Sequence, residues 1–344
     1  MKRKRLAVFS VVLLTTFLLV FSFAFSGAEK PTEAGKPEGK KWFIASSVMT
    51  LQFPWFLGTV EGMENIVNER GDIELVWQDA RFDINVQVDQ LESFAEMGID
   101  GLIIYATDAK AVIPTMKDLH AKGIKIVTAD YKQDPDSPDD VVWETFVGHD
   151  FRQMGRVAGK IAVEYLKTIK DHKPIAVWLT SPPSGQVSID RIEGFKEVVL
   201  KALPNVQIVE EGNPQATRES AQSVFENLMQ VYPKIDLVSG HNSDFVLGAY
   251  NAAVAAGRRD IKFIGMAGYA DVLTYIDKGN EQWLGEVLQD PVVLGETSMK
   301  AMIEALEGKK IPETYELPEP EAITPANISQ YDWKNWAWLG LKKK

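Results

Sequence analysis

Cysteine is absent from the 344-residue chain. Without a thiol there can be no disulfide framework, no thiol nucleophile and no thiolate metal ligand. The absence also excludes a lipid anchor on an N-terminal cysteine, which favours a soluble mature protein over a tethered one. The chain is long enough for two domains of ordinary size, so its stability is expected to come from substantial hydrophobic cores.

Several enzyme motifs are also missing. No G-x-G-x-x-G follows the first expected strand, where a dinucleotide-binding fold needs it, and the chain has neither a P-loop nor a G-x-S-x-G elbow. The histidines are scattered and lack H-E-x-x-H or another ligand spacing; they are His120, His149, His172 and His241. Many Asp and Glu residues are available, but nothing singles out a catalytic pair. We therefore expect no enzyme, no cofactor and no metal site.

Positive charge is in short supply. Lys and Arg total 37 against 48 Asp and Glu, which gives a formal charge of −11. Four of the basic residues lie in Lys2–Arg5, so losing this segment leaves 33 cations and a charge of about −15. A protein this acidic is not expected to take nucleic acid or an anionic membrane as its main partner.

The N-terminal segment has the three parts of a secretory signal peptide. Lys2–Arg5 is basic, Leu6–Phe25 is almost wholly apolar, and Ser26-Gly27-Ala28 offers small residues for cleavage. We predict residues 1–28 as a signal peptide and residues 29–40 as a flexible lead-in. The alternative is an uncleaved membrane anchor, because the apolar stretch is long enough to span a bilayer.

From Trp42 onward, apolar runs of strand length alternate with segments of helical periodicity. The expected strands are 42–47, 73–77, 101–105, 124–130, 141–147, 175–180, 206–209, 235–239, 261–266 and 283–288. The expected helices are 54–67, 85–97, 112–123, 152–167, 189–200, 218–231, 245–256, 270–278 and 292–306. Two successive runs of strand–helix units predict an α/β protein with two parallel, three-layered sheets.

Side chains suited to a polar, uncharged ring stand at or just beyond the expected strand ends, where open α/β sheets bind ligands. Carboxylate, guanidinium and amide groups hydrogen-bond to hydroxyls, and aromatic rings stack on apolar ring faces. The candidate residues are Phe53, Trp55, Phe56, Tyr105, Asp130, Tyr131, Arg191, Asn242 and Gln289.

Each candidate also has an ordinary structural explanation. Asp130 could cap the turn that follows it, and Asn242 could be a turn residue. Phe56 could belong to the core, and Arg191 could form a surface ion pair. Their joint position at strand ends nevertheless favours one shared site.

Seven ordered stretches carry a resemblance to bacterial periplasmic sugar-binding proteins of the ribose-binding type, the solute receptors of ABC importers. They are Phe53-Pro-Trp-Phe56, Gly101-Leu-Ile-Ile-Tyr-Ala-Thr-Asp108, Ile126-Val-Thr-Ala-Asp130, Arg191-Ile-Glu-Gly-Phe195, Asn242-Ser-Asp-Phe-Val-Leu-Gly-Ala249, Phe263-Ile-Gly265 and Gln289-Asp-Pro291. Together they run from about Trp42 to Glu307.

The resemblance implies a type I periplasmic binding protein: two Rossmann-like α/β/α lobes joined by a three-stranded hinge, which close on a monosaccharide. On this basis we assign residues 41–148 and 290–319 to the N-terminal lobe. Residues 149–289 and 320–344 then form the C-terminal lobe. The resemblance also implies a monomer that works in the periplasm with a membrane permease.

The same resemblance implies roles for the candidate residues. Trp55 and Phe56 would sandwich the sugar, and Asp130 would bind its hydroxyls from the first lobe. The polar contacts from the second lobe and the hinge would come from Arg191, Asn242 and Gln289.

Four positions depart from the pattern of a ribose receptor. Phe53 and Tyr105 stand where such a receptor has Asn, Tyr131 stands where it has Arg, and Ala267 stands where it has Asp. The expected site is thus more aromatic and has one carboxylate fewer. Ribose is one possible ligand among several; xylose, glucose, another neutral pentose or hexose, or a cyclic polyol fits as well.

Three alternatives to a sugar receptor stay open at this point. The first is a receptor for a furanose-like signalling molecule or one that reports to chemotaxis, and the second is an extracytoplasmic carbohydrate-acting α/β enzyme. A sugar-responsive transcription regulator shares the lobe architecture, but it needs a basic helix-turn-helix where this chain has its leader.

The chain ends in an aromatic segment, Tyr331 to Leu339, which contains three tryptophans. Large aromatic residues mostly serve cores and interfaces. We therefore expect packing across the back of the two domains, rather than contact with a membrane or a partner.

Overall fold

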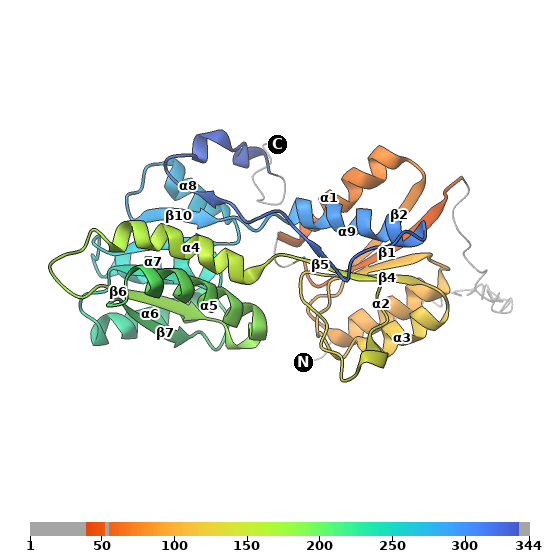
Figure 1. Cartoon of the computed structure of the whole chain (residues 1–344), viewed down its shortest axis with the longest axis horizontal. Helices are drawn as coiled ribbons and strands as arrows, with labels where there is room; N and C mark the ends of the chain where they lie inside the picture. The colour runs from red at the N-terminus through yellow and green to blue at the C-terminus, as the bar shows by residue number, and fades with distance from the viewer. Residues whose placement is uncertain (1–38, 52–54, 337–344) are drawn as a thin grey trace, which may run out of the picture.

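The structure is a computed structural model that describes residues 39–51 and 55–336. The expected signal peptide, most of the lead-in, Phe53 and Trp338 lie outside these ranges, so the predictions for them stay predictions. Figure 1 shows two α/β lobes side by side, linked by connecting segments of the chain. Among the helices of the described ranges, none combines the length and apolarity that a membrane span requires.

The first lobe is built on six parallel strands in the order β11-β5-β4-β3-β1-β2. These are β1 (Trp42–Val48), β2 (Ile73–Asp79), β3 (Gly101–Ile104), β4 (Lys125–Ala129), β5 (Thr145–Gly148) and β11 (Thr314–Glu316). Helices α1 (Trp55–Arg70) and α9 (Pro291–Leu306) cover one face, and α2 (Ile84–Glu96) and α3 (Ile113–Ala121) cover the other. Successive strand side chains alternate between the two faces, so Ile44 packs with α1 and α9 while Phe43 packs with α2 and α3.

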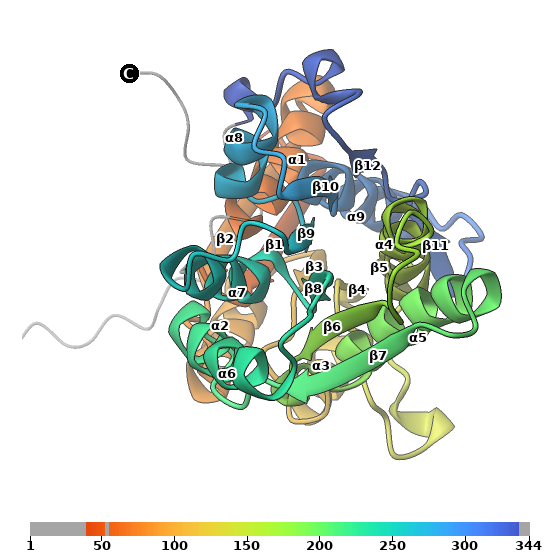
Figure 2. The same ribbon diagram turned by 90° about the vertical axis from the view of Figure 1, so that its left-hand side faces the viewer.

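The second lobe repeats this plan with the order β12-β10-β9-β8-β6-β7. Its strands are β6 (Ile175–Thr180), β7 (Gln207–Gly212), β8 (Leu237–Gly240), β9 (Lys262–Met266), β10 (Trp283–Val287) and β12 (Ala322–Ile323). Its helices are α4 (Phe151–Leu166), α5 (Gly185–Ala202), α6 (Arg218–Val231), α7 (Ser243–Ala255) and α8 (Ala270–Asp277). Figure 2 shows α4 and α5 on one side of this sheet and α6 and α7 on the other.

The chain crosses between the two sheets three times. The crossings lie between β5 and α4, between β10 and α9, and between β11 and β12. Two sheets that exchange three segments in this way form the expected two-lobed α/β fold, and the predicted fold class is confirmed. The division into residues 41–148 with 290–319 and 149–289 with 320–344 stays our proposed partition of the chain.

The structure corrects several details of the predicted elements. The expected strand 141–147 begins only at Thr145, because residues before it form a 3-10 turn at Pro138–Asp140 and extended chain. The short strands β11 and β12 were not predicted, since two or three residues are too few to show periodicity. Because β12 pairs antiparallel with β10, the second sheet is not wholly parallel.

Capped helix N-termini follow two of the crossings. Asp150 caps α4 by accepting a hydrogen bond from the backbone N–H of Gln153 over 2.8 Å. Asp290 caps α9 by accepting from the N–H of Val292 over 2.9 Å, with Pro291 in the first helical turn. Such caps satisfy backbone N–H groups that have no partner within the helix. They fix where each crossing ends and each helix begins.

Two reciprocal pairs of glycines bring helices into backbone contact, one pair in each lobe. A Cβ on Gly62 of α1 would lie 2.1 Å from the carbonyl oxygen of Val292, and one on Gly295 of α9 would lie 2.0 Å from that of Thr59. In the second lobe, a Cβ on Gly155 of α4 or on Gly194 of α5 would lie 1.9 Å from a carbonyl oxygen of the facing helix. No other residue fits these positions without moving a helix, so each pair of helices packs as one unit.

The described part of the aromatic C-terminal segment, Tyr331 to Trp336, packs on the second lobe. Trp333 is 4% exposed and belongs to the core that α6, α7 and α8 cover. Tyr331 and Trp336 pack against the same core, with their ring centroids 6.3 Å apart. The expected packing role is therefore right, but the described part of the segment does not extend across both lobes.

Candidate functional site

A hydrogen-bonded series of three side chains connects the two lobes. Gln289, in the second crossing, donates from Nε2 to Oδ1 of Asp130 over 3.3 Å and accepts at Oε1 from Nη2 of Arg191 over 2.8 Å. Asp130 follows β4 in the first lobe, and Arg191 lies in α5 of the second. Each of the three is at most 6% exposed. One amide thus links a carboxyl of one lobe to a cation of the other at the hinge.

Asp130 is held in an unusual backbone conformation. Its φ of 67° lies in the left-handed region, and its N–H donates to the carbonyl oxygen of Val147 over 2.9 Å. Burial raises the pKa of its carboxyl to about 7, while the charge of Arg191 and the hydrogen bond from Gln289 act in the opposite direction. The side chain therefore faces the second lobe as a carboxyl whose neutral form is favoured by burial.

Arg191 is buried, not exposed. Its Nη1 donates to the carbonyl oxygen of His241, and its guanidinium lies over the ring of Phe151 at 5.0 Å. Nε is buried and has no hydrogen-bond partner among the described residues. The charge of Asp130 favours the protonated form of Arg191, but no carboxylate of the described chain forms an ion pair with its guanidinium. The alternative of a surface ion pair is therefore wrong, because Arg191 is 3% exposed.

Aromatic side chains from the first lobe lie beside this bridge. The indole Nε1 of Trp55 donates to the backbone carbonyl of Gln289 over 2.9 Å. Trp55 meets Phe56 edge to face at 5.1 Å, and Phe56 meets Tyr105 in the same way at 6.0 Å. Trp55 is half-buried and packs against the cores of both lobes, whereas Tyr105 has no exposed surface. Of these three rings, that of Trp55 is therefore the most exposed.

Tyr131 forms a second aromatic contact near the hinge. It is half-buried and meets Phe151 of α4 edge to face at 6.5 Å, which joins the two lobes. Burial and the nearby Asp130 charge raise the pKa of its hydroxyl to about 12. Tyr131 therefore stays neutral at physiological pH and can donate a hydrogen bond.

The remaining two candidates lie at strand ends of the second lobe, Asn242 after β8 and Ala267 after β9. Asn242 caps α7, because its Oδ1 accepts from the N–H of Phe245 over 3.2 Å. The alternative was a turn residue; the structure instead shows a helix N-cap, which occupies the side-chain oxygen. Ala267 follows β9 with a φ of 92°, is 8% exposed, and offers no polar side chain.

Two histidines belong to the same region and were missed from the sequence. His149 follows β5, and His241 follows β8; they are 8% and 6% exposed. Both ring nitrogens of His149 and Nδ1 of His241 are buried without a well-formed hydrogen bond in the described chain. Burial and the Arg191 charge lower the pKa of His149 to about 3 and that of His241 well below its usual value. Their strand-end position is the signal in the sequence that could have revealed them, since their spacing fits no metal site.

A groove of about 1270 Å³ runs between the lobes beside this cluster. Of the candidate residues, Tyr131 is among those that line it, and His149, Phe151, Asp108 and Arg156 line it as well. The described residues contain no group of three or more His, Asp or Glu side chains arranged to hold a metal ion.

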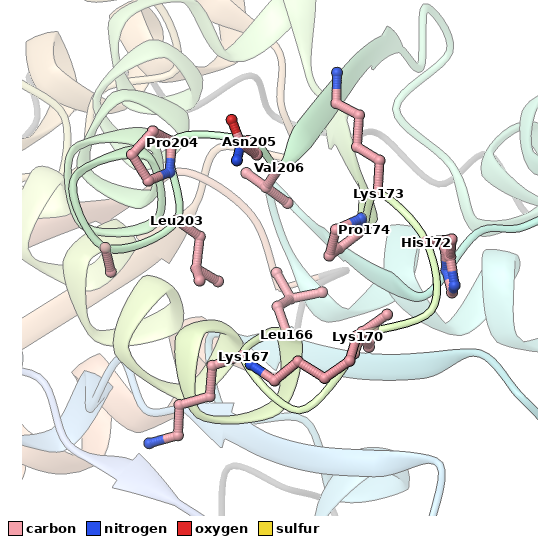
Figure 3. Close-up of a pocket in the computed structure, with 12 residues that line it drawn as sticks. Leu166, Lys167, Lys170, His172, Lys173, Pro174, Leu203, Pro204, Asn205 and Val206 are labelled. Atoms are coloured by element: carbon pink, nitrogen blue, oxygen red, sulfur yellow. The ribbon is translucent and has the colours of Figure 1, made fainter.

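A smaller hollow of about 650 Å³ lies at another part of the second lobe. It is formed by the C-terminal ends of α4 and α5 and by the chain that leads into β6 and β7, at the strand edge opposite the cleft. Figure 3 shows Leu166, Leu203 and Val206 around the hollow, while Lys167 and Lys173 point away from it. None of the candidate residues lines it, so we do not assign the ligand site there.

Comparison with known proteins agrees with this geometry. A family model described as "Periplasmic binding protein domain" matches residues 44–310. The ribose import binding protein of Bacillus subtilis is 29% identical over 311 residues, which cover 90% of this chain and 96% of the relative. The xylitol-binding protein of Mycolicibacterium smegmatis is 27% identical over 278 residues, which cover 78% of this chain and 73% of the relative.

Solved structures show the same fold. An ABC transporter solute-binding protein from Mycobacterium smegmatis with bound glycerol superposes with a TM-score of 0.72 at 27% identity, covering 84% of this chain and 96% of that one. A solute-binding protein from Actinobacillus succinogenes with bound D-allose gives a TM-score of 0.75 at 20% identity, covering 85% and 100%. The chain therefore belongs to the periplasmic binding protein family, in its ribose-type branch, whose members are binding receptors and not enzymes.

Proposed function

We propose that the mature chain is an extracytoplasmic receptor that closes on one neutral monosaccharide or cyclic polyol and delivers it unaltered to the permease of an ABC importer. The names of its relatives point to ribose, xylitol and D-allose, and solved relatives hold D-allose and myo-inositol. All of these ligands are uncharged and rich in hydroxyl groups, which agrees with a site that mixes donors and acceptors.

The observation that carries the proposal is the bridge from Asp130 through Gln289 to Arg191. Each group in it can bind a hydroxyl: the carboxyl accepts, the guanidinium donates, and the amide does both. Two neutral histidines, His149 and His241, add acceptor and donor positions without adding charge. A ligand rich in hydroxyl groups matches such a set, because each hydroxyl can both donate and accept a hydrogen bond.

The aromatic residues take different parts in this proposal. Trp55 offers a half-buried ring face on which an apolar sugar face can stack, and its N–H is already held by the hinge. Phe56 is 5% exposed and supports Trp55, and Tyr105 supports Phe56 from within the core. Tyr131 closes the hinge side, where its hydroxyl remains a donor. Phe53 keeps its predicted role as a ligand contact from the first lobe.

The second lobe supplies the opposing contacts. Arg191 has a buried Nε without a partner, so it has donor capacity left for a ligand. Asn242 uses its oxygen for the α7 cap, which leaves its amide NH₂ for a sugar oxygen. Ala267 lets the ligand approach the backbone closely where a larger side chain would project.

Closure would occur by rotation of the two lobes about the three crossings. A ligand that binds groups of both lobes favours the closed state by its differential affinity for that state. A micromolar complex requires about −8 kcal/mol, which a few charge-assisted hydrogen bonds of about 1.5–3 kcal/mol each can supply after ordering costs. The closed monomer would then dock on the permease, and removal of residues 1–28 would release it into the periplasm.

A thermal-unfolding screen of residues 29–344 against pentoses, hexoses, furanoses and polyols tests the proposal. A ligand at 100 times its dissociation constant adds about 2.7 kcal/mol of stability, which is a shift of several degrees for a chain of this size. Calorimetric titration should then give one site, and the recovered ligand should be chemically unchanged. If no compound of the panel binds, or if a product forms, the receptor assignment is refuted.

A further inference from the structure

The first observation is a carboxyl buried in the middle of the second lobe. Glu286 of β10 has no exposed surface, and it lies between β9 and β12 in the sheet. The resemblance that identified the candidate residues did not include it, and in sequence it is one acidic residue within an expected buried strand. Burying a carboxyl costs free energy unless its oxygens are hydrogen-bonded, so the partners of Glu286 indicate what keeps it there.

Glu286 holds the loop that follows β9. Its Oε1 accepts hydrogen bonds from the backbone N–H groups of Gly268 over 2.6 Å and of Tyr269 over 3.0 Å. This loop begins with Ala267, whose φ of 92° is costly for a residue with a side chain, and continues through Gly268 with a φ of 84°. The two hydrogen bonds therefore hold a strained segment in one shape.

The same carboxyl also holds the start of α7. Oγ of Ser243 lies 2.7 Å from Oε1 and 2.8 Å from Oε2 of Glu286, and 2.9 Å from the carbonyl oxygen of Met266. The N–H of Met266 donates to this Oγ over 2.7 Å. Glu286 thus connects the end of β9, the loop after it and the first residue of α7, which directly follows Asn242.

Hydrogen counting shows which form of the carboxyl satisfies this network. Ser243 has one hydroxyl hydrogen and three acceptors in reach. A protonated Glu286 donates from Oε2 to the Ser243 Oγ, which frees the hydroxyl hydrogen for the Met266 carbonyl, while Oε1 keeps both backbone donors. Every polar atom then has a partner. Burial raises the pKa of Glu286 to about 7, in agreement with a large neutral fraction.

The sequence makes room for this arrangement at one position. A Cβ on Gly265 of β9 would lie 1.7 Å from Oε2 of Glu286 and 2.6 Å from Oγ of Ser243. Only glycine leaves space for the carboxyl beside the strand. The charged and titratable groups on the elements that pack around it are Tyr269, Asp244, Arg218 and Asp271, which interact with one another at the cleft end of the lobe.

We infer that Glu286 is a positioning residue for the ligand site: it sets the shape of the Ala267–Tyr269 loop and the placement of Asn242 at the start of α7. The inference rests on the proposed function, because both segments lie at the strand ends where the sugar is expected. Where the ribose-type pattern has an Asp in the cleft, this chain has Ala267. Glu286 instead acts indirectly, by holding the loop that begins at Ala267. Glu286 itself has no exposed surface, so its role is exerted through these two segments.

Two substitutions at one position test this role. Gln in E286Q keeps an oxygen for the two backbone N–H groups and an NH₂ for Ser243, so ligand affinity should stay within threefold of wild type. Leu in E286L keeps the volume and loses both functions, so affinity should fall at least tenfold. The matched control is D236N, which alters a carboxyl that is 9% exposed just before β8, at the opposite end of the strands of the same sheet; its affinity should stay within twofold.

Amide hydrogen exchange gives a readout that does not depend on the ligand. The N–H groups of Gly268 and Tyr269 should exchange at least tenfold faster in E286L than in wild type, and at the wild-type rate in E286Q. If E286L does not fold, S243A decides, with faster exchange of the same two amides and at least threefold weaker binding expected.

The possible results separate the two ideas. Equal affinity of E286L and wild type, equal loss in E286Q and E286L, or unchanged exchange at both amides overturns the role of Glu286. Failure of the wild-type protein to bind any tested sugar refutes the proposed function instead, and the exchange measurement then still decides whether Glu286 holds the loop.

Discussion

Replacement of Arg191 by methionine should separate ligand binding from stability. The guanidinium is 3% exposed, and within the described chain it is bonded to a carbonyl and an amide, not to a carboxylate. A buried cation without a paired anion costs several kcal/mol in desolvation. Under the proposed function, a bound sugar would supply acceptors for this cation.

The magnitudes follow from these contacts. Loss of one charge-assisted hydrogen bond to the ligand costs about 1.5–3 kcal/mol, so R191M should weaken sugar binding by about 10- to 150-fold. For the free protein, the His241 carbonyl and the Gln289 amide each lose a partner at about 1–3 kcal/mol, and removal of the buried cation offsets most of this cost. The free energy of unfolding should therefore change by less than about 2 kcal/mol.

Calorimetric titration with the best sugar of the panel and chemical denaturation of the free protein measure the two quantities. R258M is the control, since Arg258 pairs with the exposed Asp260 at the far edge of the second lobe; its affinity should be unchanged. Sugar affinity of R191M within twofold of wild type would show that Arg191 does not contact the ligand. A loss of more than about 4 kcal/mol in the free energy of unfolding would show that the positive charge of Arg191 is compensated by an anion in the free protein.

Four further predictions follow from the site and the core. W55F should bind sugar more tightly than W55A, because it keeps the ring face while losing the bond to the Gln289 carbonyl; titration of both variants against wild type measures the difference, and equal affinities would remove Trp55 from the site. Burial raises the folded-state pKa of Asp130 to about 7, so the folded protein favours the neutral carboxyl. The contribution of Asp130 to the free energy of unfolding is therefore complete below its unfolded pKa near 4 and is lost as pH rises through 7. The total effect is at most about 4 kcal/mol, and D130N should flatten that part of the stability profile measured by denaturation between pH 5 and pH 8. H149A should weaken sugar binding severalfold with little change in melting temperature, and unchanged affinity would show that its unpaired nitrogens face no ligand. G62A should lower the free energy of unfolding by about 1–3 kcal/mol, because its methyl group meets the Val292 carbonyl; an unaltered denaturation midpoint would contradict the close contact of α1 and α9.

Much of the fold was predictable because its signals are local. Buried parallel strands appear as apolar runs and their helices as 3.6-residue periodicity, so most elements of both lobes were found to within a few residues. The short strands β11 and β12 leave no such pattern. Their membership in different sheets depends on the hinge, which only the assembled structure defines.

The candidate site was predictable in its members but not in its contacts. Strand ends identified Asp130, Arg191 and Gln289, yet their bridge joins positions as far apart as 159 residues. The burial of Arg191 could not be inferred, because isolated arginines are usually exposed. His149 and Glu286 were overlooked, since one histidine at a strand end and one acidic residue within a strand have many ordinary explanations.

The glycine contacts between helices have a mechanical consequence. Helices α4 and α9 each begin where a crossing ends. Close backbone contacts at Gly155 join α4 to α5, which carries Arg191, and those at Gly295 join α9 to α1, which begins at Trp55. A rotation of the connecting chain should therefore displace Arg191 and Trp55, our proposed ligand contacts, by the same angle. If the proposed function is correct, the position of the ligand contacts and the outer surface of the two lobes are expected to change together in one rotation.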